Sequence, residues 1–156
     1  MKKITTSLVF FVFVLISCET SVKFNNPSLQ GLHGQELWTA QTYSAIKTAS
    51  GLTIKGNKGY ETIILQVPSS SPQIFNLGSN SAVYAIFDNK NEGNVNNYNT
   101  GVTGVGTGQI VINEYSSGVI SGTFNFVATN TDPLLTTPDK ANFRQGTFYK
   151  IPVSNQ

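Results

Sequence analysis

The cysteine at position 18 is the residue whose type and position point most directly to a chemical reaction. It is the only cysteine of the 156-residue chain, and it follows an apolar run from Leu8 to Ile16 that Lys2 and Lys3 precede. A basic start, a short apolar stretch and small residues before a break are the layout of a secretory signal peptide. A membrane-spanning helix needs about 20 apolar residues, roughly twice the length of this run. The thiol of Cys18 is therefore the first candidate for chemistry.

The four residues Leu15-Ile16-Ser17-Cys18 resemble the lipobox of bacterial lipoproteins. The resemblance implies that residues 1–17 are a signal peptide cleaved before Cys18, and that the Cys18 sulfur receives a diacylglycerol. Two acyl chains hold a protein stably to a membrane, whereas one chain does so only marginally. We therefore expect a lipid-anchored protein of the cell envelope, at the outer membrane. The alternative is an ordinary signal peptide, whose cleavage would remove Cys18 or leave it as a stray thiol.

A catalytic centre has few residues to draw on in this sequence. His33 is the sole histidine and has glycines close by, so we expect a solvated loop side chain; a catalytic triad also needs a positioned nucleophile and a third group. A glycosidase requires two carboxyl groups about 5–9 Å apart, and the eight acidic residues are scattered over turns and strands. We predict no catalytic residue, no cofactor and no enzymatic activity.

A calcium site is suggested by only one segment, Asp88–Gly93, which starts like an EF-hand loop. Lys90 stands where that loop needs an oxygen ligand, and Asn99 stands where it needs a glutamate. A zinc site would need three or four His, Cys or acidic ligands. We predict a polar hairpin and no metal site, with looser calcium binding by residues 88–94 as the alternative. The glycines between Gly101 and Gly108 precede a predicted strand rather than a helix, which favours a loop over a phosphate site.

The charge balance argues against a nucleic-acid partner. The chain has 10 Lys plus Arg and 8 Asp plus Glu. Lys2 and Lys3 leave with the signal peptide and all the acids follow Cys18, so the mature chain stands at 8 − 8 = 0. A neutral chain without a basic cluster lacks the electrostatic footprint of nucleic-acid binding.

Residues 18–35 are predicted to be a flexible tether, because they are rich in small and polar residues and show no sustained hydrophobic period. The alternative is that Val22-Lys23-Phe24 pairs as an edge strand. Residues 36–156 form the folded domain. This domain must be stabilised by a hydrophobic core, since the acylated Cys18 leaves no thiol for a disulfide.

The elements that must position any site are strands, because apolar residues recur with a period of two after Glu36. Residues 60–67, 109–113 and 119–126 alternate, and residues 82–87 form a continuous apolar run typical of a strand covered on both faces. Turn clusters occupy residues 49–51, 56–59, 68–72, 89–94 and 116–118. The spacing predicts an all-β fold: a single antiparallel β-sandwich, or a barrel-like sheet. Its core should include Ile54, Ile63, Leu65, Val83, Phe87, Ile110, Ile112, Phe124 and Phe126.

Two strands share the tripeptide Gly-Thr-Phe, at Gly122 and at Gly146. A duplication is one interpretation; we favour two core strands that use similar residues, since three letters are few. Gly122 lies inside its strand, where glycine often marks a bulge or a close backbone approach.

The chain also resembles a protein family in several short motifs. These are Gly34 to Ala40 (Gly-x-x-x-Trp-x-Ala), Tyr98-Asn99-Thr100, residues 120–126, and a Gly-Thr-Phe strand ending in Ile151-Pro152-Val153. Together they resemble an uncharacterised family of small β-rich lipoproteins from Bacteroidota, a domain of unknown function, over roughly residues 30–153. Arg144-Gln145 departs from the Thr-Asn or Thr-Glu that often precedes the glycine there. The resemblance implies an envelope lipoprotein with a β-sandwich and carries no catalytic residues.

Two classes of function follow from these observations. The first is a structural or interaction domain of the envelope, held to the membrane by the lipid on Cys18 and without catalysis. The second is a module that binds a glycan or another ligand, because sugar sites combine exposed aromatic residues with amide and carboxylate groups. The chain holds Trp38, six Tyr and many Asn. Burial of Trp38 would remove the best single candidate for such a site.

Overall fold

The computed structural model of the protein describes residues 26, 28–78, 82–91, 94–101, 106–130 and 140–156. These residues contain strands and no helix, which confirms the all-β prediction. In chain order the strands are β1 (Ser28–His33), β2 (Glu36–Thr39), β3 (Thr42–Thr48), β4 (Gly51–Lys58), β5 (Glu61–Val67), β6 (Gln73–Asn76), β7 (Tyr84–Asn91), β8 (Asn94–Asn99), β9 (Thr107–Ser116), β10 (Val119–Asn130) and β11 (Lys140–Asn155).

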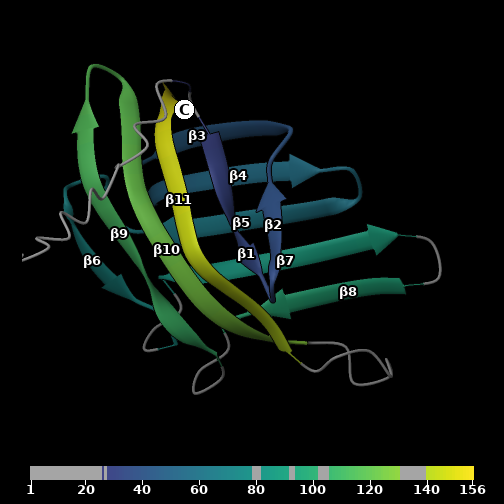
Figure 1. The fold of residues 1–156 in the computed structure, drawn as a ribbon. Coiled ribbons are helices and arrows are strands. Elements are labelled where there is room, and N and C mark those ends of the chain that lie inside the picture. The colour runs from purple at the N-terminus through teal and green to yellow at the C-terminus, as the bar shows by residue number, and fades with distance from the viewer. Residues whose placement is uncertain (1–25, 27, 79–81, 92–93, 102–105, 131–139) are drawn as a thin grey trace, which may run out of the picture.

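All eleven strands belong to one sheet, in the order β2-β1-β11-β3-β4-β5-β7-β8-β10-β9-β6. Neighbouring strands are antiparallel except β11 and β3, which pair in parallel. An additional pairing of β10 with β11 closes seven of the strands, β11-β3-β4-β5-β7-β8-β10, into a ring. Figure 1 shows the result: β9, β10 and β11 run steeply, and β3, β4, β5, β7 and β8 run across them. The two sheets expected of a sandwich are therefore parts of one continuous, mostly antiparallel sheet that wraps around its core.

The core follows the two-residue period of the sequence. In β5, Ile63, Leu65 and Val67 are buried and the residues between them are half-buried. All nine core residues predicted from the sequence are buried: Ile54, Ile63, Leu65, Val83, Phe87, Ile110, Ile112, Phe124 and Phe126. The expectation of a strand covered on both faces at residues 82–87 is wrong, since Tyr84 and Ile86 remain partly exposed on the outer face of β7.

The predicted tether at residues 18–35 is wrong for its second half. Ser28–His33 form β1, which pairs antiparallel with both β11 and β2, and the Leu29 side chain is fully buried. Leu29 and Leu32, separated by glutamine and glycine, give almost no hydrophobic period, so the strand depends on pairing with β11, which is distant in sequence. Residues 18–25 and 27, including the alternative strand at Val22, lie outside the described residues.

The repeated Gly-Thr-Phe has a packing explanation. In the antiparallel pair of β10 and β11, Gly122 lies opposite Phe148 and Phe124 lies opposite Gly146. A Cβ added to Gly122 would meet the Phe148 ring at 2.3 Å, and one added to Gly146 would meet the Phe124 ring at 2.5 Å. Each glycine therefore provides the space for the phenylalanine ring of the other strand. Both alternatives named for Gly122 are met: the ladder shifts register next to it in both pairings, and an added Cβ would lie 2.0 Å from the Val111 carbonyl oxygen.

Two-residue turns close both the β9–β10 hairpin and the β4–β5 hairpin. The predicted turn at residues 116–118 is confirmed, with Ser117 and Gly118 both at positive φ (53° and 74°), as a type I′ turn requires. The turn predicted at 56–59 lies further along, because β4 continues to Lys58, which pairs with Glu61. The two-residue turn is Gly59-Tyr60, with Gly59 at φ 55°.

Candidate functional site

A row of polar side chains lies at one end of the β4, β5 and β7 layer. Lys58 of β4 is directly opposite Glu61 of β5, and Glu61 is directly opposite Asn89 of β7. Residues that face each other across neighbouring strands project from the same side of the sheet. Ile63 is buried two residues further along β5, so this row continues the core-facing side of the sheet at its rim.

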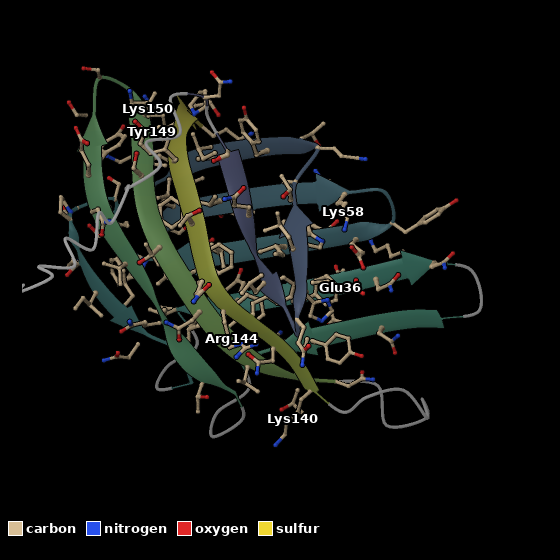
Figure 2. All side chains as sticks on the ribbon, viewed as in Figure 1. Glu36, Lys58, Lys140, Arg144, Tyr149 and Lys150 are labelled. Atoms are coloured by element: carbon tan, nitrogen blue, oxygen red, sulfur yellow. The ribbon has the colours of Figure 1, made fainter. Side chains whose placement is uncertain are left out.

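An open hollow of about 330 Å³ lies over this row. We call it the rim hollow; its lining residues are Gln41, Lys58, Gly59, Tyr60, Glu61, Asn89 and Asn91. They come from the corner before β3, the β4–β5 turn and strand β7. Figure 2 shows Lys58 at this end of the layer, with Glu36 below it. The hollow therefore combines one aromatic ring, three side-chain amides, one cation and one carboxylate.

Tyr60 is the exposed aromatic residue of the rim hollow, with 66% of its surface accessible. It occupies the second position of a two-residue turn, where its side chain cannot reach the core. The turn itself is held on both sides: Lys90 N–H donates to the Tyr60 carbonyl at 3.0 Å, and Gly59 N–H donates to Gln41 Oε1 at 3.2 Å. The ring therefore projects from a backbone with a defined position.

Trp38 supports the rim hollow from inside the molecule. Its side chain is only 2% exposed, and its Nε1–H donates to Glu61 Oε2 at 2.8 Å. A buried indole N–H needs such a partner, and the bond fixes the Glu61 carboxylate at the rim. Trp38 is therefore a core residue that orients a residue at the rim. Because it is buried, it cannot make the exposed contact with a sugar for which it was the best single candidate.

His33 is not the solvated loop residue that the sequence predicts. It ends β1, and its ring stacks on Phe143 with centroids 4.6 Å apart and planes within 4°; the Phe87 ring lies 4.8 Å away. Burial lowers the pKa of His33 from its ordinary value of 6.5, against the opposing attraction of Glu61 and Glu36 for the charged form. The half-buried imidazole is thus part of an aromatic cluster.

The segment resembling an EF-hand begins as regular strand. Asp88 and Lys90 belong to β7, and Asp88 Oδ1 accepts a hydrogen bond from Asn97 Nδ2 of β8. Residues 92 and 93 lie outside the described residues. In the ranges that the structure describes, no three His, Cys, Asp or Glu side chains gather as metal ligands would. Gly106 and Gly108 lie where β9 begins, as the predicted loop-to-strand order requires; residues 102–105 lie outside the description.

The predicted lipid attachment residue, Cys18, lies outside the described residues. Among the residues that are described, none forms a helix with the length and hydrophobicity that a membrane crossing requires. Sequence reasoning missed Gln41, Lys58, Tyr60 and Glu61 as site residues. The available signal was a Gly-Tyr pair between two alternating runs, which places an aromatic residue in a tight turn.

Comparison with known proteins places the chain in a family. The family model described as "Domain of unknown function (DUF6252)" matches residues 25–152. No curated protein and no solved structure gives a match. The match spans β1 to β10 and most of β11, so it includes both the core and the rim hollow. The chain therefore belongs to the DUF6252 family of domains of unknown function.

Proposed function

We propose that the protein is a lipid-anchored lipoprotein of the bacterial cell envelope that acts by binding and not by catalysis. The observation that carries this proposal is the sequence Leu15-Ile16-Ser17-Cys18 after a basic and apolar signal. The resemblance to Bacteroidota lipoproteins supports the same anchor and an outer-membrane location.

The start of β1 limits how far from the membrane the proposed anchor would hold the domain. Ser28, where β1 begins, follows Cys18 by ten positions in the chain. Even a fully extended chain of that length spans only about 35 Å. The folded domain would therefore stay within about its own diameter of the lipid surface, which suits a protein that meets partners close to the membrane.

The packing of His33 supports a role without catalysis. The chain has one histidine, and its ring is occupied by stacking on Phe143. Binding is the second element of the proposal, and the rim hollow favours it, since amides, a carboxylate and an exposed ring surround an open space.

The anchor is tested by changing Cys18 to Ser in the full chain. Cells fed an alkyne-tagged fatty acid should label the wild-type protein, and mass spectrometry should find an acylated cysteine at the mature N-terminus. Cys18→Ser should lose the label and leave the membrane fraction, whereas the neighbouring change Ser21→Ala should keep both. An unlabelled wild-type protein with a free N-terminus beyond residue 18 would overturn the proposal.

A further inference from the structure

We infer that the rim hollow is a carbohydrate site that holds one ring of a neutral oligosaccharide. This inference deepens the binding role proposed above by naming the class of ligand. It rests on four properties of the hollow: its exposed ring, its pre-oriented hydrogen-bonding groups, its balanced charge and its size.

The ring of Tyr60 provides the apolar contact. One face of a pyranose ring presents C–H groups, and these pack well on the electron-rich face of an aromatic ring. Such a contact is favoured by an accessible ring that projects from a backbone with a defined position. Tyr60 meets both conditions, because its side chain is largely exposed while its carbonyl is held by Lys90 N–H and the adjacent Gly59 N–H by Gln41.

The hydrogen-bonding groups around Tyr60 match sugar hydroxyls, which both donate and accept. Side-chain amides also do both, and Gln41, Asn89 and Asn91 line the hollow. Two of these amides already use their oxygens: Gln41 Oε1 accepts from Gly59 N–H, and Asn89 Oδ1 accepts from Asn91 N–H at 3.0 Å. Their amino groups therefore remain as donors toward the hollow. Glu61 Oε2 accepts the hydrogen bond from Trp38, so Glu61 Oε1 remains as an acceptor with a fixed direction. The site is therefore built before a ligand arrives.

The charges in the hollow favour a neutral ligand over a phosphate or an acidic sugar. Lys58 and Glu61 are direct cross-strand partners, so the cation and the carboxylate largely offset each other. Recognition of anions uses clustered cations, arginine above all, and the lining contains a single lysine and no arginine. Neutral hydroxyls lose less on leaving water than charged groups do.

The size of the hollow limits the ligand to about one sugar ring. Its volume of about 330 Å³ stands at the lower end of the range for small-molecule sites, roughly 300–1,000 Å³. Because the hollow is open, the rest of a chain could continue into solvent on either side. A terminal or internal residue of an oligosaccharide fits this arrangement.

The test uses the full chain purified in detergent and an array of neutral and acidic oligosaccharides. We expect binding to neutral glycans, confirmed by titration with the best neutral hit. Trp38 is the only tryptophan and is bonded to Glu61, so its fluorescence should change on binding. Tyr60→Ala should weaken binding about tenfold, or about 1.4 kcal/mol, and Tyr60→Phe, which keeps the ring, should retain it. Asn91→Ala should also weaken binding.

Three controls make the result decisive. Tyr149→Ala removes a tyrosine of β11 that Figure 2 shows apart from Lys58, and it should bind as the wild type does. The Tyr60 and Asn91 variants should keep the wild-type melting temperature, since both side chains are exposed. Cys18→Ser should bind the glycan normally, so failure of the anchor and failure of the site are separate results. Absence of binding, binding of acidic glycans only, or full binding by Tyr60→Ala would each overturn the inference.

Discussion

At the scale of single residues, the position of His33 links the packing of the aromatic cluster to the charge state of a histidine. Its ring joins β1 to the aromatic cluster through Phe143 and Phe87, and Phe143 in turn contacts Trp38 and Phe126. A histidine in such a cluster is stable in its neutral form, because a charged imidazole would lose solvation there. Glu36 and Glu61 offset part of this cost, and Lys58 adds to it.

The lowered pKa of His33 predicts that stability decreases as the pH falls below about 6.5. The unfolded state binds a proton at its ordinary pKa, while the folded state binds it only at lower pH. The stabilisation from the neutral ring is therefore complete above that value and is lost on acidification. Urea denaturation at about pH 7.5 and about pH 5.5 should show this loss.

The matched variant is His33→Phe, which keeps a ring at this position and cannot titrate. It should lose most of the wild-type pH dependence in that range, because the chain has no other histidine. His33→Ala should cost about 1–3 kcal/mol at neutral pH, less than a fully buried aromatic ring. Equal pH dependence in wild type and His33→Phe would contradict this account.

At the scale of elements, the exchange of rings between β10 and β11 explains why two strands carry the same tripeptide. The three closest atoms to a Cβ added at Gly146 all belong to the Phe124 ring, at 2.5–2.6 Å. At Gly122, in contrast, the closest atom is the backbone carbonyl oxygen of Val111, at 2.0 Å. A substitution can replace the Phe124 ring with a smaller side chain. The Val111 carbonyl, in contrast, cannot move without breaking hydrogen bonds between paired strands.

This difference predicts a double-mutant cycle with opposite outcomes at the two glycines. Gly146→Ala should destabilise the wild type by about 1–3 kcal/mol through overpacking. In a Phe124→Leu background the cost should fall by about 1 kcal/mol or more, because the obstructing ring is gone. Gly122→Ala should keep most of its cost in a Phe148→Leu background, because the contact with the Val111 carbonyl oxygen remains when the ring is gone. Equilibrium denaturation of the single and double variants measures all four values; equal coupling at both sites would show that the backbone contact is unimportant.

Three strands that the sequence did not predict, β1, β6 and β8, are short and hold only two apolar or aromatic residues each. β8 reads Asn-Val-Asn-Asn-Tyr-Asn, a composition typical of turns, yet it pairs with β7 and β10. Beyond its end, the buried Thr100 accepts a hydrogen bond from Ala85 N–H at 2.8 Å. β1 and β6 are similar, with Leu29 and Phe75 as their buried anchors. In such strands the pairing partner supplies the stability that composition does not.

At the scale of the whole molecule, the parallel pairing of β11 with β3 joins the strands around β1, β10 and β11 to the run β3-β4-β5-β7-β8. It is short: Val153, Ser154 and Asn155 lie opposite Ala45, Ile46 and Lys47. It also contributes the bond from Gln156 N–H to the Lys47 carbonyl at 3.0 Å. A contact between segments about 100 residues apart closes a long loop and stabilises the fold only after the other pairings exist.

A chain ending at Pro152 should therefore open the sheet at this seam. Amide hydrogen exchange should increase in β3, which would lose one neighbour and become an edge strand, while β9 and β10 keep their protection. The matched control is a chain ending at Asn155, which retains all three register pairs. Uniform loss of protection over the sheet would show that the seam is required for the whole fold, and unchanged exchange in β3 would show that it contributes nothing.

The sequence by itself determined the all-β class, the nine predicted core residues and the Ser117-Gly118 turn. These follow from alternation and turn chemistry, which act between neighbouring residues. It also supplied the prediction of a lipid on Cys18. Only the tertiary structure decided that β1 belongs to the sheet, that Trp38 is buried, that His33 stacks on Phe143 and that the rim hollow exists. Each of these depends on partners far apart in the chain, and the pairing of distant strands leaves no local pattern in sequence.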